Sequence, residues 1–274
     1  MRFALSLATL TVLLGQPLAA QQNSTARATI DPAEGFAPAR AAEREDNGWI
    51  LVEGAVSDLT AGRDDWHELA VTSLIPVGAR DTLVLSAARH ERFGLTDVEI
   101  GALYTARAAE DVWLRAGASL TPSADFRPSV GMTAGLDWRV VPGRNATVIG
   151  FDSGWRDFPL QNVWNFSPSL TQFVAGGKAS ITVRASGIAA QGEPLRVGGL
   201  IRGDVYSADG TRAFLGAASG PDTDFGIVSE RTSLFGGLEV PVAGGLAITG
   251  SIANEWRNGL LDRTEGRIGV KVGL

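Results

Sequence analysis

The chain has 274 residues and carries 24 basic and 30 acidic side chains, which gives a net charge of −6. This acidic balance argues against a nucleic-acid partner, because nucleic-acid sites need clustered Lys and Arg. The sequence contains no cysteine, so it offers neither disulfides nor thiolate metal ligands. Its 34 glycines lie largely within alternating apolar runs, which indicates tight-turned β structure rather than disorder.

The first 20 residues have the features of an export signal. Arg2 supplies a positive charge, residues 3–15 form a short apolar core, and Ala19 and Ala20 offer a cleavage point. The apolar core is too short for a helix that spans a membrane. We therefore expect a signal peptide over residues 1–20.

Residues 21–47 have a different composition. They are rich in Ala, Pro, Gln and mixed charges and show no sustained apolar period, which is typical of a flexible segment. We expect a flexible periplasmic leader here, with a plug inserted into the lumen of the following domain as the alternative.

Residues 48–274 form one long series of segments in which apolar and polar side chains alternate. The last segment shows the pattern most clearly. One face carries Thr264, Gly266, Ile268, Val270, Val272 and Leu274, and the other carries Arg263, Glu265, Arg267, Gly269, Lys271 and Gly273. Because successive side chains of a strand point to opposite faces, such a strand is apolar outside and charged inside. This is the pattern of a transmembrane β-barrel.

The pattern predicts an all-β fold, an antiparallel up-and-down transmembrane β-barrel of 14 strands, with 12 strands as the alternative if one hairpin is miscounted. The expected strands cover 49–56, 66–76, 82–92, 96–107, 112–120, 127–141, 146–158, 162–175, 179–189, 195–207, 211–218, 228–240, 246–257 and 261–274.

Two kinds of connection alternate along the chain. The short ones are VGARD, AAED, PGRNA, AGGK, ADG and VAGG, and the mostly longer ones include SDLTAGRD, TPSADF, PLQN, AQGEP and SGPDTDFGI. Outer-membrane barrels have short periplasmic turns and longer external loops. We therefore expect all the short turns, and the C-terminus, on the periplasmic side.

The inward faces of the expected strands carry charges of both signs. The residues predicted to line the lumen are Arg115, Asp137, Arg139, Asp152, Arg184, Arg202, Asp204, Glu255, Arg263, Glu265 and Arg267. They could form cross-strand salt bridges that rigidify a narrow interior. They could instead form a selectivity lining for a small polar or charged solute.

Large aromatic side chains lie near the ends of the expected strands. They are Trp49, Trp66, Trp155, Phe158, Phe225 and Trp256. Such positions suit aromatic girdles at the level of the lipid headgroups.

Four stretches resemble the YaiO-type outer-membrane β-barrel family. They are GRDDWHEL around Trp66, RHERFGLTDVEIGALY from Arg89 to Tyr104, FRPSVGMTAGLDWRV from Phe126 to Val140, and GWRDF from Gly154 to Phe158. The resemblance implies a bacterial outer-membrane barrel without an assigned activity and without catalytic residues to carry over. The chain departs from the common outer-membrane pattern because it ends in Leu274 rather than in Phe or Trp.

We therefore expect a non-enzymatic, monomeric barrel in the outer membrane of a Gram-negative bacterium, with a structural, passive-transport (porin-like) or surface-interaction role. Its expected partners are outer-membrane lipid, the barrel assembly machinery and a small polar solute, and we expect no cofactor and no metal. One alternative is a lipid-acting hydrolase that uses His90 with a Ser. Another is a soluble periplasmic β-sandwich that serves as a binding protein.

Overall fold

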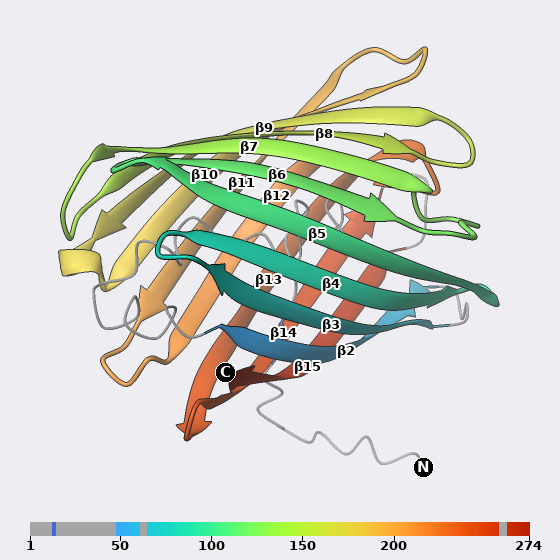
Figure 1. Cartoon of the computed structure of the whole chain (residues 1–274). Helices are drawn as coiled ribbons and strands as arrows, with labels where there is room; N and C mark the ends of the chain where they lie inside the picture. The colour runs from blue at the N-terminus through green and yellow to red at the C-terminus, as the bar shows by residue number, and fades with distance from the viewer. Residues whose placement is uncertain (1–12, 15–47, 61–64, 258–261) are drawn as a thin grey trace.

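The structure, a computed structural model, describes residues 13–14, 48–60, 65–257 and 262–274. Within these residues, strands β2 to β15 form one closed antiparallel sheet in which each strand pairs with its neighbours in the sequence (Figure 1). The barrel closes between its last and first strands, from Gly273 opposite Trp49 to Arg263 opposite Leu59. The prediction of a 14-stranded barrel is confirmed, and the two-layered β-sandwich is wrong.

The strands of the barrel are 9 to 17 residues long. Their bounds are β2 Trp49–Leu59, β3 Trp66–Val77, β4 Asp81–Arg92, β5 Leu95–Ala109, β6 Val112–Leu120, β7 Val130–Val141, β8 Thr147–Asp157, β9 Asn162–Val174, β10 Ala179–Ala190, β11 Arg196–Tyr206, β12 Arg212–Asp224, β13 Ile227–Ala243, β14 Leu246–Arg257 and β15 Arg263–Gly273. A short 3-10 turn, η4 (Ala175–Gly177), follows β9.

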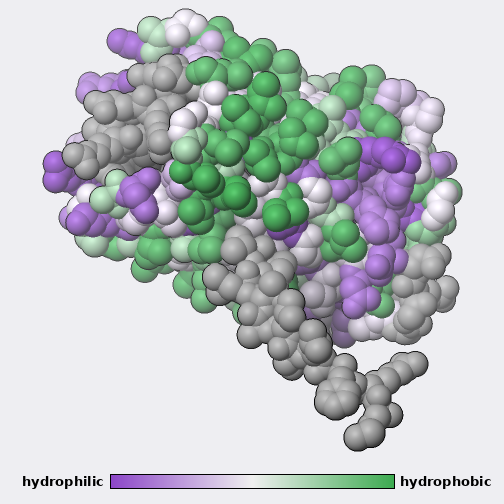
Figure 2. Space-filling view, turned by 90° about the horizontal axis from the view of Figure 1, so that it is seen from below, coloured by the Kyte–Doolittle hydropathy of each residue, from purple (hydrophilic) through white to green (hydrophobic). Residues whose placement is uncertain are grey.

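The exterior of the barrel is apolar and its interior is polar. In β15, Ile268 is 62% exposed, whereas Arg267 on the opposite face is 3% exposed. Large exposed apolar side chains occur on every barrel strand, among them Leu69, Met132, Val183 and Leu215. Figure 2 shows such side chains gathered over the middle of one face, with hydrophilic ones toward its sides. Because lipid cannot satisfy an open sheet edge, a closed barrel with this exterior is built to span a membrane.

The two ends of the barrel have different connections. Strand β2 starts, and β15 finishes, at the end that carries the turns 78–80, 110–111, 142–146, 175–178, 207–211 and 244–245. We call this end the turn end, and the opposite end the loop end. The predicted short turns all lie at the turn end, together with both termini of the barrel. Several of them hold glycines with positive φ, such as Gly78 and Gly210, as tight hairpins require.

The prediction of long external loops is wrong for the segment SGPDTDFGI. Most of it continues strands β12 and β13, and only Phe225 and Gly226 form the turn. In the sequence, Pro221 and the acidic residues that follow it are typical of a loop. The strand tolerates Pro221 because the pairing of β12 with β11 stops at Ser219, which leaves β12 paired with β13 alone at this point. The acidic side chains face arginines rather than water.

The expected strand 127–141 also begins too early, because residues 127–129 belong to a loop and β7 starts at Val130.

The girdle prediction is wrong for three of the six aromatic residues. Trp66 and Phe158 are buried, and Phe225 contacts other rings at the loop end. Trp256, by contrast, is 43% exposed on the outer wall.

Most of residues 1–47, the predicted signal peptide and leader, lie outside the described residues. The exception is β1 (Leu13–Leu14), which pairs in parallel with β14 at Ser251 and Ile252. Among the described residues, no helix has the length and hydropathy needed to cross a membrane.

Candidate functional site at the loop end of the barrel

The eleven residues predicted to line the lumen all lie on the buried or half-buried face of their strands. All of them except Arg184 form ion pairs among the described residues. Arg184, on β10, has a buried Nε without a hydrogen bond in the described part of the chain. The charges of the lumen therefore largely neutralise one another.

One cluster lies on the wall formed by β6, β7 and β8. The guanidinium of Arg115 pairs with Asp137 and, through Nη2, with Asp152 Oδ1 at 2.7 Å. Gly135 opposite Arg115 makes room for this cluster, because an added Cβ would lie 2.9 Å from Arg115 Nε. The glycine lets charged side chains lie flat against the wall.

The largest cluster is centred on Glu255 of β14. Its carboxylate accepts hydrogen bonds from Arg231 Nη1 at 2.7 Å, Arg263 Nη2 at 2.7 Å and Arg257 Nη2 at 3.0 Å. Asp222 adds a second carboxylate 3.3 Å from Arg231 Nη1. All of these side chains are almost completely buried. Three guanidinium groups so close together repel one another unless the Glu255 carboxylate lies between them.

Further ion pairs extend this network toward the turn end. Arg263 and Arg267 both contact Glu265, and Arg267 Nη1 donates to Glu68 Oε1 at 3.1 Å. Lys271 pairs with Glu239 at 3.1 Å. The halves of β11 and β12 nearer the turn end hold a separate group of charged side chains. There Arg202 and Arg212 share Asp204, and Arg202 lies 4.2 Å from the ring centroid of Phe214. Arg139 pairs with Asp111, which lies in a turn.

Side chains that come from opposite sides of the barrel meet at the loop end. Arg92 ends β4 and Asp224 ends β12, and five strands separate them on the shorter way round the ring. Even so, Arg92 Nη1 donates to Asp224 Oδ1 at 2.5 Å. The next residue of each hairpin is a phenylalanine, and the ring centroids of Phe93 and Phe225 lie 6.5 Å apart. We call these contacts across the loop end the mouth closure.

A third segment, loop 121–129, joins the mouth closure. Phe126 is buried at its tip and packs on Phe225 with a centroid distance of 5.5 Å. The carboxylate of Asp97 holds the loop by accepting the backbone N–H groups of residues 125, 126 and 127 at 2.7–3.0 Å. Arg127 then donates to Glu99 Oε2 through both Nε and Nη2. Because a carboxylate with this many donors is held firmly, the loop is fixed in its inward position.

The geometry of β12 explains why its hairpin leans over the mouth. Past Ser219 the strand has lost β11 as a partner, and residues 220–223 are buried on both faces. Gly220 has a φ of +143° and lies against Gly198, where an added Cβ would come within 2.6 Å of the Gly220 Cα atom. Two glycines thus let two backbones approach closely, so that the hairpin can bend inward.

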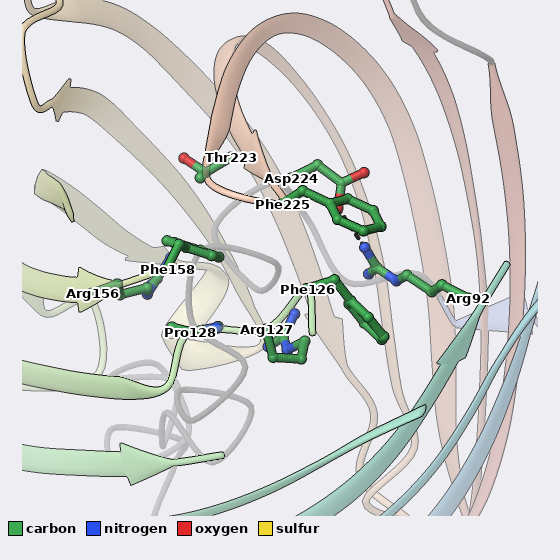
Figure 3. A pocket seen from close by; sticks show the side chains of 9 residues that line it. All are labelled: Arg92, Phe126, Arg127, Pro128, Arg156, Phe158, Thr223, Asp224 and Phe225. Carbon is green, nitrogen blue, oxygen red and sulfur yellow. Dashed lines mark hydrogen bonds and ion pairs between the residues drawn. The ribbon is translucent and has the colours of Figure 1, made fainter. Parts of the chain in front are cut away.

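A pocket lies beside these contacts (Figure 3). The space inside it is about enough for one water molecule. Its lining consists of Arg92, Phe126, Arg127, Pro128, Arg156, Phe158, Thr223, Asp224 and Phe225. We call it the mouth pocket. Three of its four charged side chains are arginines, and three of the others are phenylalanines.

His90 lies in the lumen and is 3% exposed. Its Nδ1 is 3.2 Å from Glu68 Oε2, so the carboxylate orients the imidazole as in a hydrolase triad. Ser86, the serine on the same strand face, pairs in register with Thr72, whereas His90 pairs with Glu68. The four-residue offset corresponds to roughly 13 Å along the strand, too far for a hydrogen bond. Within the described chain, no three His, Asp or Glu side chains are grouped as metal ligands would be.

Sequence reasoning did not identify the mouth closure. Phe158, Phe225 and Trp66 were correctly predicted to lie at strand ends. They were wrongly predicted to face the lipid headgroups. The available signal was the pair of Phe-Gly turns, at residues 93–94 and 225–226. A bulky residue with positive φ is costly, so a repeated Phe at that position indicates that its ring has a specific partner.

The sequence matches no protein-family model, and it matches no curated protein. The fold is similar to solved outer-membrane barrels. One, described as a bacterial polysaccharide outer membrane secretin, has a TM-score of 0.54 at 10% identity, covering 84% of this chain and 99% of the other. The NanC porin has a TM-score of 0.49 at 11% identity, over 82% of this chain and 100% of the other. A loop-deletion mutant of OmpT from Vibrio cholerae has a TM-score of 0.47 at 12% identity, over 82% and 98%.

The likeness to the secretin establishes the fold alone. The even number of antiparallel strands in the closed sheet and the apolar exterior are those of an integral outer-membrane β-barrel.

Proposed function

We propose that the protein is a non-enzymatic, porin-like barrel for small polar solutes, and that the mouth closure keeps it shut in the conformation described above. The observation that carries the proposal is the ion pair between Arg92 and Asp224, which joins opposite sides of the ring. A barrel that serves only as a scaffold does not need to place its loops across its own opening. A polar interior behind such a closure is what a gated conduit requires.

The closure rests on a few side chains at hairpin tips. Phe93 has a φ of 51° and Phe225 a φ of 54°, and each is followed by a glycine that also has positive φ, as in a type I′ turn. A residue held in this region costs about 1–3 kcal/mol. Because contacts across the mouth must offset that cost, the closed arrangement is one that a modest change can release.

We further propose that the resemblance to the YaiO-type family concerns this end of the barrel. The quoted stretches are far apart in the sequence, yet six of the nine residues that line the mouth pocket come from three of them. These residues are Arg92, Phe126, Arg127, Pro128, Arg156 and Phe158. The fourth stretch supplies Trp66, whose ring lies 4.1 Å from the guanidinium carbon of Arg92.

The test is the current through refolded protein in planar lipid bilayers. Phe93→Gly with Phe225→Gly removes both rings and keeps turns that accept positive φ. We expect wild-type protein to be silent for most of the recording and the double variant to carry a steady current. Phe151→Ala, which removes a ring from the lipid-facing wall, is the control and should remain silent.

A structural barrel is the second candidate, because the ion pairs of the lumen favour it. Charges that neutralise one another do not select a solute. If the double variant is as silent as the wild type while folding normally, the passage is blocked by these ion pairs and the porin-like proposal is wrong. A steady current through the wild type would equally contradict the closure.

A further inference from the structure

We infer that the lumen wall around Arg184 selects small carboxylate anions among the polar solutes of the proposed passage. The inference deepens the proposed function, because it names the class of solute and the residue that recognises it. It rests on that function only for transport, since a carboxylate can bind at Arg184 whether or not the barrel conducts.

The two sides of the lumen differ in how much of their surface is accessible. On β14 and β15 the inward side chains of Ser251, Glu255, Arg263 and Arg267 are all buried. On β9, β10 and β11 the inward side chains near mid-height are only half-buried, and they include Ser169, Thr182, Arg184, Ser186 and Leu200. Arg184 itself is the sixth of the 12 residues of β10. A solute in the lumen therefore has access to this wall at mid-height.

Arg184 carries a charge that is not offset within the described part of the chain. The other ten charged residues predicted to line the lumen all form ion pairs. Neither β9 nor β10 contains an acidic residue. The closest carboxylate in register on the β9 side is that of Asp152 on β8, two strands or roughly 10 Å away. Because it pairs with Arg115 at 2.7 Å, it does not compensate Arg184.

The β11 side gives the same result. Leu200 lies opposite Arg184 in the register of β10 and β11. The acidic residue of β11 is Asp204, and its carboxylate accepts hydrogen bonds from both Arg202 and Arg212. An arginine without a neighbouring carboxylate, in a partly desolvated lumen, creates a positive potential that attracts anions.

The groups around Arg184 suit a carboxylate. The planar donors of a guanidinium match the two oxygens of a carboxylate. Ser169 lies opposite Arg184 on β9, and Thr182 and Ser186 lie two residues away on the same face of β10, so hydroxyl groups can donate further hydrogen bonds to the anion. On the other side, Leu200 packs against the apolar cluster around Phe235 and offers a contact for the carbon part of the solute.

Modification with butanedione, a small reagent for arginine, tests the site in folded, detergent-solubilised full-length protein without any current. Mass spectrometry gives the rate at each arginine. We expect Arg184 to react faster than Arg115 and Arg267, whose guanidinium groups are buried in ion pairs. Potassium acetate should slow the reaction of Arg184 roughly tenfold relative to potassium chloride of equal ionic strength, because acetate binds the guanidinium through two oxygens. Arg80, exposed in turn 78–80, is the internal control and should react equally fast in both salts.

A rate at Arg184 no higher than at Arg115 would overturn the inference. Equal rates at Arg184 in acetate and chloride would overturn it as well, as would equal slowing of Arg80 by acetate.

Selectivity is measured in the opened background, Phe93→Gly with Phe225→Gly, from the reversal potential in a gradient of potassium acetate. Adding Arg184→Gln should lower the permeability ratio of acetate to potassium roughly tenfold, since a charged hydrogen-bond partner is lost. Adding Arg80→Gln, which removes the same charge outside the lumen, should leave the ratio unchanged. Heat-modifiable gel mobility shows whether each variant folds.

An unchanged ratio in Arg184→Gln would contradict selection by this wall. If the opened barrel carries no current, the gated conduit is wrong, and the butanedione rates still decide whether Arg184 binds a carboxylate. The two proposals can therefore fail independently.

Discussion

Phe93 and Phe225 hold the same position in two Phe-Gly turns, and their rings meet 6.5 Å apart although their hairpins start from opposite sides of the ring. Each ring is carried by a residue with positive φ. Each ring also packs on a second ring at 5.5 Å, Phe93 on Trp66 and Phe225 on Phe126, and these contacts together offset the cost of the two positive-φ turns. The turns of the loop end therefore contribute to the stability of the barrel through contacts with one another, besides connecting the strands.

The ion pair beside these rings can be measured by a double-mutant cycle. Arg92→Gln leaves Asp224 with Arg257 alone, and Asp224→Asn leaves Arg92 without its 2.5 Å partner. We expect each single change to lower the free energy of unfolding by about 2–4 kcal/mol, because a largely buried charge loses its partner. The double variant should lose less than the sum of the two. Urea titration followed by gel mobility gives the values, and strict additivity would show that the pair does not interact.

Glu255 should be the most sensitive carboxylate of the lumen. Glu255→Gln removes the one carboxylate that contacts Arg231, Arg257 and Arg263 together, so less of their mutual repulsion is offset. We expect a loss of about 3–5 kcal/mol in the free energy of unfolding. Glu239→Gln, which affects one half-exposed pair with Lys271, should cost less than about 1 kcal/mol. Similar costs for the two changes would contradict a cooperative network.

Whether the sequence predicts a feature of this structure depends on how far apart in the chain the interacting residues lie. The alternation of Ile268 with Arg267 is local, so the strands, their count and the direction of their faces follow from the pattern. The turns at Gly78 and Gly210 are local as well. The contact of Arg92 with Asp224 joins residues 132 positions apart, and no local pattern predicts it. Pro221 was predicted to lie in a loop for the same reason. A Pro can stay within a strand where the neighbouring strand on one side has ended, and the local sequence does not show where that neighbour ends.

The inward bend of β12 depends on one close approach between two glycines. Gly198→Ala would place a Cβ 2.6 Å from Gly220 Cα and 2.6 Å from the Ser219 carbonyl oxygen. We expect this backbone clash to displace the hairpin, to weaken the mouth closure, and to cost about 1–3 kcal/mol of stability. Gly199→Ala is the matched control, because its Cβ would meet only the Arg184 carbonyl oxygen at 3.4 Å. Equal stability of the two variants would argue against the bend.

The cost of placing a charge on the lipid-facing wall should depend on its depth in the bilayer. Ile268 lies near the middle of β15 and is 62% exposed, so Ile268→Arg should cost about 2–4 kcal/mol of stability in lipid vesicles. Thr264→Arg, on the same face but near the strand end, should cost about 0–1 kcal/mol. Urea titration of tryptophan fluorescence in vesicles gives both values. If the end position were the more costly one, the assumed placement in the bilayer would be wrong.

The most direct measurement of the mouth closure uses the absence of cysteine in the sequence. Phe93→Cys combined with Phe225→Cys introduces two thiols, one on each of the meeting hairpins. A short bifunctional thiol reagent, added to the folded barrel in lipid, should link them within one chain. Phe93→Cys combined with Leu160→Cys, a position whose side chain is 68% exposed, should not be linked by the same reagent. Efficient linkage of the first pair alone is the predicted result, and linkage of the first pair only by reagents that span the barrel would contradict the closure.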